Sequence, residues 1–74
     1  MRDMRYGIVI EKSADGYGAY VPDLPGCAVV GDSIEETETL MEQAIQLHLR
    51  TMQKDGDPIP QPTTIVGYVE IPAM

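Results

Sequence analysis

The stretch that decides the fold is YGAYVPDLPGCAVVGDSIEETETL, residues 17–40. The side chains of residues 17–21 alternate between two faces, as in a β-strand. Residues 27–31 form a short apolar run, which predicts another strand. Pro22 ends the first of these strands because proline has no N–H to donate to a ladder. The stretch therefore predicts two strands joined by a rigid corner, with a helix beginning after the second strand.

The corner VPDLPGC combines residues that restrict the backbone. Pro22 and Pro25 fix φ, and Gly26 can adopt the positive φ that a tight turn requires. Asp23 is expected to accept a hydrogen bond from a backbone N–H two residues on and so to fix the turn further. Leu24 is expected to be an apolar residue presented at the tip.

Strand patterns continue on both sides of the corner. Residues 4–12 alternate with a period of two, and the turn formers of residues 13–16 join them to residues 17–21 as a β-hairpin. Residues 63–72 are apolar on both faces, which predicts a last strand covered on two sides. The alternating prolines of residues 57–62 predict an extended connector before it.

A helix is predicted from Ser33 to Gly56. Ser33 followed by Glu36 is the capping-box arrangement, and Gly56 suits a C-terminal cap. At about 100° per residue, one apolar face is predicted. Its members are Ile34, Thr37, Met41, Ala44, Ile45, His48 and Met52. The structural motif assigned to this region and the corner comprises Tyr20, Pro22, Asp23, Pro25, Gly26, Cys27, Ser33 and Glu36.

These elements predict an α+β domain of order β-β-β-α-β over residues 1–74. A right-handed crossover returns the last strand beside the first, which gives a mixed four-stranded sheet of order 3-2-1-4 with one helix on one face. This arrangement resembles a partial ribonuclease-H-like fold. The other sheet face has no cover, and the third and fourth strands are edges, which favours pairing with another chain.

Composition restricts the class of partner. The chain of 74 residues has 12 acidic residues against five Lys and Arg, and a net charge of −7. Phosphate backbones repel such a chain, so direct nucleic-acid binding is not expected. A basic protein partner is consistent with the charge, although solubility alone also accounts for it. The sequence contains no run of about 18 apolar residues, so no membrane span is predicted. No signal peptide is recognised either, and a cytoplasmic protein is expected.

Candidate chemistry is sparse. Cys27, the single cysteine, and His48, the single histidine, have no sequence feature that brings them together. Cys27 is therefore interpreted as a buried packing residue and His48 as a core or interface residue. One Cys and one His cannot close a zinc site, so no metal and no cofactor is expected. A metal-dependent ribonuclease would need convergent carboxylates, for which Glu11 and Glu70 near strand ends are the available candidates.

The ordered pieces YVPDLPGC, GDSIEE, the AI and HL of the helix, and DGDPIP resemble the HicB antitoxin family, over nearly the whole chain. The resemblance implies a non-catalytic, partial ribonuclease-H-like domain that binds and neutralises a small basic mRNA-cleaving toxin of the HicA type. It also implies a homo-oligomer, dimer or tetramer. Many members carry a C-terminal DNA-binding domain, whereas this sequence ends after the fourth strand, so none is expected here.

Three hypotheses follow: an antitoxin module, an orphan structural or adaptor domain without a toxin, and a metal-dependent ribonuclease. For the antitoxin, toxin contact is expected from the acidic side of the helix, the open sheet face or an edge strand. The candidate partner-binding residues are Glu35, Glu38, Glu42 and Leu24.

Overall fold

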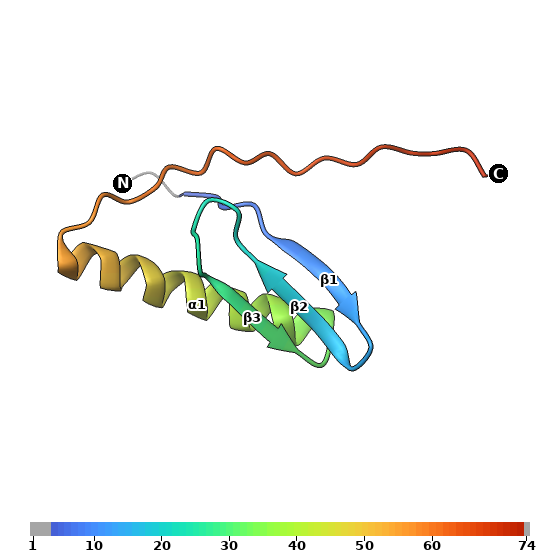
Figure 1. Ribbon diagram of the computed structural model, residues 1–74, viewed down its shortest axis with the longest axis horizontal. Helices are drawn as coiled ribbons and strands as arrows, with labels where there is room; N and C mark the ends of the chain where they lie inside the picture. Colours follow the sequence, from blue (N-terminus) through green and yellow to red (C-terminus); the bar gives the residue numbers. More distant parts are fainter. Residues whose placement is uncertain (1–3, 74) are drawn as a thin grey trace.

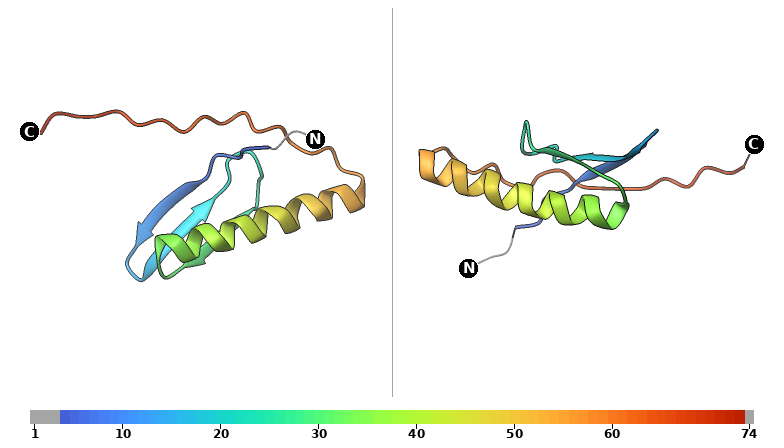
Figure 2. Two further views of the ribbon diagram at one scale, coloured as in Figure 1. Left: turned by 180° about the vertical axis from the view of Figure 1, so that it is seen from behind. Right: turned by 90° about the horizontal axis from the view of Figure 1, so that it is seen from below.

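Three antiparallel strands and one long helix form two layers (Figures 1 and 2). The computed structural model describes residues 4–73. The elements are β1 (Val9–Ser13), β2 (Gly16–Tyr20), β3 (Ala28–Gly31) and α1 (Ile34–Asp55), and the sheet order is β1-β2-β3. The predicted α+β class and the order of these elements are confirmed.

The β1–β2 hairpin has the predicted turn, with Ser13 paired to Gly16. Ala19 and Val21 lie on the face toward α1 and are 4% and 2% exposed, whereas Tyr20 points to the other face. β1 is shorter than predicted, since its ladder ends where Val9 pairs with Tyr20. Beyond that pair the Val21 N–H is used by the corner, and Pro22 has none to offer.

The corner closes on itself through three backbone hydrogen bonds. Val21 donates to the Cys27 carbonyl, Leu24 to Val21, and Cys27 to Leu24, each at 3.1 Å. Gly26 has a φ of +83°, the positive value that was predicted. The prediction for Leu24 is wrong, because its side chain is 0% exposed. The closed corner turns this side chain into the core, because removing its apolar surface from water lowers the free energy of the folded state.

The predicted helix start and end are both confirmed. The Glu36 N–H donates to Ser33 Oγ at 3.1 Å, although the Glu36 carboxylate accepts from the Asp32 N–H rather than from Ser33. At the other end Gly56 has a φ of +75° and donates to Gln53, while the next N–H reaches back to Met52. This pair of bonds is a Schellman motif.

Helix α1 packs on β2 and β3 through a close approach at its first turn. A Cβ added to Gly31 would lie 2.5 Å from Thr37 Oγ1 and 3.1 Å from the Thr37 nitrogen. Thr37 is 0% exposed and its hydroxyl donates to the Ser33 carbonyl at 2.6 Å. Met41, one turn later, is 1% exposed in the core beside Leu24 and Cys27.

The predicted fourth strand is not formed, and within residues 4–73 the order 3-2-1-4 is reduced to β1-β2-β3. Residues 57–73 are extended but lie outside any ladder. They run back from the end of α1 past the start of β1 and then diverge from it (Figure 1). A strand needs a neighbouring strand for its backbone hydrogen bonds. Because residues 57–73 diverge from β1, the β1 strand of the same chain cannot be that neighbour.

Candidate protein-binding surfaces

A groove runs between the chain that precedes β1 and one side of α1; we call it the α1 groove. It encloses about 370 Å³. Its lining consists of Met4, Tyr6, Ile8, Glu38, Met41, Glu42, Ile45 and Gln46. Glu38 and Glu42 are one helical turn apart and both are exposed, so they form an acidic rim beside apolar side chains. Such a groove suits a side chain with an apolar stem and a cationic end.

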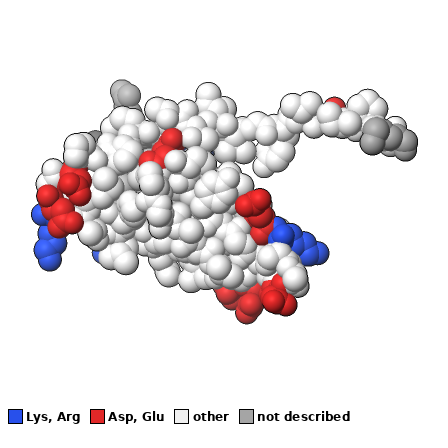
Figure 3. Space-filling view, viewed as in Figure 1, with Lys and Arg blue, Asp and Glu red and all other residues white. Residues whose placement is uncertain are grey.

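The sheet face opposite α1 is open. Pairing aligns Val9, Tyr20 and Ala28 in one row on this face, and Val30 lies in the next row. Tyr20 is 44% and Val30 is 76% exposed. Figure 3 looks onto this side, where most charged side chains lie around the margin. The open sheet face is therefore a second surface with the character of a protein interface.

The third feature is a junction between the corner and residues 63–64. The Asp23 carboxylate accepts hydrogen bonds from the Thr63 and Thr64 N–H groups at 3.0 and 2.9 Å. It also accepts from their hydroxyls at 3.1 and 2.8 Å. These bonds, those from Thr64 first, hold the pKa of Asp23 below its ordinary value, although desolvation opposes the shift.

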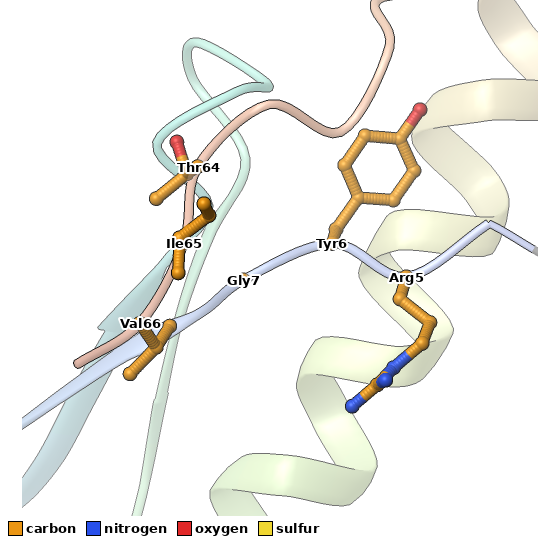
Figure 4. A pocket seen from close by; sticks show the side chains of 6 residues that line it. All are labelled: Arg5, Tyr6, Gly7, Thr64, Ile65 and Val66. Carbon is orange, nitrogen blue, oxygen red and sulfur yellow. The ribbon is translucent and has the colours of Figure 1, made fainter.

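This junction corrects the predicted role of Asp23. The residue two positions on is Pro25, which has no N–H, so the turn bond could not form. The Tyr6 hydroxyl adds a hydrogen bond to the Pro60 carbonyl at 2.5 Å. Burial, together with the nearby Asp23 charge, raises the pKa of Tyr6. Beyond the junction, Val66 lies beside Gly7 in the hollow drawn in Figure 4.

Cys27 and His48 lie closer than the sequence indicated, because both line one shallow hollow between the corner and α1. Cys27 is 5% exposed, and burial raises the pKa of its thiol. A nucleophilic cysteine needs the opposite shift, toward the thiolate. The arrangement therefore agrees with packing rather than with nucleophilic chemistry.

The carboxylates proposed for a ribonuclease are not assembled into a site. Glu11 lies on β1, and Glu70 lies in the diverging part of the chain. Among residues 4–73, no three His, Cys, Asp or Glu side chains are grouped so that they could hold a metal ion. Over the same residues, α1 is too polar to cross a membrane.

The family follows from comparison with known proteins. The sequence pattern of the HicB-like antitoxins of bacterial toxin–antitoxin systems matches residues 6–74. The chain belongs to the HicB-like antitoxin family. A protein of Haemophilus phage HP1 is 39% identical over 93% of this chain, and a UPF0150 protein of Synechocystis is 36% identical over 89%. The antitoxin HicB 2 of Photorhabdus laumondii is 30% identical over 97%.

The match covers different shares of these HicB-like relatives. It spans 52% of the phage protein and of HicB 2, and 85% of the Synechocystis protein. Among solved structures, a chain of the HicA3 and HicB3 toxin–antitoxin complex matches with a TM-score of 0.70 and 30% identity. That match covers 81% of this chain and 70% of the other.

The predicted partner-binding residues fare differently in this HicB-like fold. Glu38 and Glu42 lie together at the α1 groove, whereas Glu35 is exposed on the first turn and is not part of its lining. Leu24 is buried, so the prediction that it contacts a partner is corrected. The Asp23 junction was not predicted, and the consecutive threonines 63 and 64 are the local signal that could have indicated it.

Proposed function

We propose that this protein is an antitoxin that binds a small basic toxin of the HicA type and neutralises it without catalysis. The observation that carries the proposal is the likeness, at a TM-score of 0.70, to a chain of a toxin–antitoxin complex. The net charge of −7 supports it, because opposite charges accelerate encounter with a basic partner.

The α1 groove is the surface that we assign to the toxin. Its apolar lining can cover the stem of an arginine or lysine, and Glu38 and Glu42 can pair with the charged end. On the open sheet face, Glu11 is the one carboxylate in the two rows that contain Tyr20 and Val30, and the other acidic side chains seen in Figure 3 are spread along the margin rather than paired beside an apolar groove. Charge complementarity therefore favours the groove over the sheet face for a basic partner.

The test uses the full chain co-expressed with HicA3 and, if a small basic protein is encoded beside this gene, with that protein as well. Growth rescue and co-purification are the two measurements. We expect both with at least one toxin. Failure of both with each toxin would overturn the antitoxin role and favour the orphan adaptor alternative.

The groove is tested separately in the complex that forms. The double variant Glu38→Gln/Glu42→Gln should weaken binding about tenfold or more, since two charge pairs are lost. The matched control, Glu35→Gln/Asp15→Asn, removes the same charge from exposed positions outside the groove. Equal weakening by both pairs would show a net-charge effect and would overturn the groove as the docking site.

A further inference from the structure

The segment that follows the Asp23 junction has the residue composition of a β-strand, yet its side chains are exposed as in a strand without a partner. We call residues 65–73 the arm. Ile65, Tyr68, Val69 and Ile71 are β-branched, aromatic or aliphatic, and they are 91%, 94%, 84% and 71% exposed. Such residues are enriched in strands because they pack on a pleated sheet. Figure 1 shows the arm extended and projecting past the body of the molecule.

The root of the arm is held against the body, which sets its starting point. Thr63 and Thr64 are fixed by Asp23, and a Cβ added to Gly7 would lie 3.1 Å from Val66 Cγ2. The arm therefore starts beside the chain that enters β1 and points in the same direction as β1 (Figure 1). After Val66 it moves away from that edge, and a Cβ added to Gly67 would have no atom within 4 Å.

The strand edge that the arm leaves is also open. In the order β1-β2-β3, β1 pairs with β2 on one side and has no neighbour on the other among residues 4–73. An open edge and an unpaired apolar strand in one chain are complementary, since each offers the backbone groups that the other lacks.

We propose that two copies of this chain exchange their arms, so that each arm pairs with the β1 edge of the other copy. In one copy the arm and its own β1 diverge, whereas a second copy presents the same edge to the projecting arm. The exchange is reciprocal and closes as a twofold dimer, the commonest form of assembly. It would complete a four-stranded sheet of order 3-2-1-4 with the last strand supplied in trans. This inference does not depend on the toxin.

The contact at the root gives an expected register. Gly7 faces the side chains of Thr64 and Val66. If the exchanged arm keeps this register, then four residues further along two parallel strands Glu11 would lie between Tyr68 and Glu70. Cysteines in place of Glu11 and Tyr68 would therefore be near each other across the exchanged pair but apart within one chain.

The experiment is disulfide trapping in the full chain with Cys27→Ser, so that no other thiol is present. The variant Glu11→Cys/Tyr68→Cys is oxidised mildly at micromolar concentration, and its mass is measured without reductant. We expect a covalent dimer. A monomer with an internal disulfide would overturn the exchange in favour of a closed four-stranded monomer. No disulfide at all would overturn the pairing with β1.

A matched control places the second cysteine elsewhere. The variant Arg50→Cys/Tyr68→Cys carries a thiol at another exposed position, on α1 and away from the β1 edge, and should give much less dimer. Comparable dimer from both variants would show random collision and would overturn the proposal.

A second measurement avoids new disulfides. Sedimentation of the unmodified chain should show a dimer, which Tyr68→Asp should weaken at least about tenfold because a charge enters the paired strand. The control Val30→Asp adds the same charge at an exposed position of β3 and should leave the dimer intact. Tyr68→Asp is not expected to unfold the body, since Tyr68 is 94% exposed there. A monomer in the unmodified chain would overturn the proposal.

Discussion

At the scale of single residues, the carboxylate of Asp23 joins two parts of the chain that lie far apart in sequence. It accepts two backbone and two hydroxyl hydrogen bonds from Thr63 and Thr64. These donors stabilise the charged carboxylate and lower its pKa. One ionised group at the corner between β2 and β3 thus helps to fix the point from which the arm starts, together with the Tyr6–Pro60 hydrogen bond.

We expect acid to release this junction. The pKa of Asp23 is lowered on folding, so its contribution to stability is present above the unfolded value of about 3.9 and is lost as pH falls through the lower folded value. The amide signals of Thr63 and Thr64, followed by NMR against pH, should shift together in that range. The variant Asp23→Asn retains an acceptor without the charge and should abolish this titration. Amide signals that do not respond to acid would contradict the junction.

Cys27 should behave as a buried packing residue. It is 5% exposed and burial raises the pKa of its thiol, so the native protein should react with iodoacetamide far more slowly than the protein in denaturant. Cys27→Ser should cost about 1–3 kcal/mol of unfolding free energy, since a hydroxyl is buried without an assured partner. Toxin binding should persist. A folded Cys27→Ser protein that no longer binds would assign the thiol a direct role.

At the scale of elements, α1 and the hairpin could be predicted because their signals are local. Ser33, Gly26 and Gly56 act through their own backbone and nearest turns, and all three have the predicted role. Leu24 could not be placed correctly, because whether an apolar residue at a turn is exposed depends on how the turn packs. The fourth strand failed for a similar reason, since strand composition does not specify the edge with which a strand pairs.

The contact between β3 and α1 gives a prediction at this scale. In Gly31→Ala the new methyl group would lie 2.5 Å from Thr37 Oγ1 and 3.1 Å from the Thr37 nitrogen. The helix would have to shift, which should lower the free energy of unfolding by about 1–3 kcal/mol. Gly18→Ala in β2 is the control, because its nearest atom is the Val29 carbonyl oxygen at 3.9 Å. Denaturant unfolding that finds equal losses for both variants would contradict the close approach.

At the scale of the whole molecule, two proposed interfaces differ in their electrostatics. The α1 groove has an acidic rim of Glu38 and Glu42, which suits a basic toxin. The arm presents mostly apolar side chains to a second copy that has the same net charge of −7. Salt screens both the attraction between unlike charges and the repulsion between like charges. Screening should therefore weaken a complex held by attraction and strengthen one opposed by repulsion.

Ionic strength should therefore separate the two interactions in one set of measurements. Between about 0.05 and 0.5 M NaCl the Debye length falls below about 10 Å, which screens long-range interactions. Toxin affinity, measured by calorimetry, should fall with salt, whereas the dimer, measured by sedimentation, should become stronger or stay unchanged because apolar contact is retained and repulsion is reduced. A dimer that dissociates in salt would imply ionic contacts in place of the exchanged arm. Toxin binding that is insensitive to salt would instead exclude Glu38 and Glu42 as its main contacts.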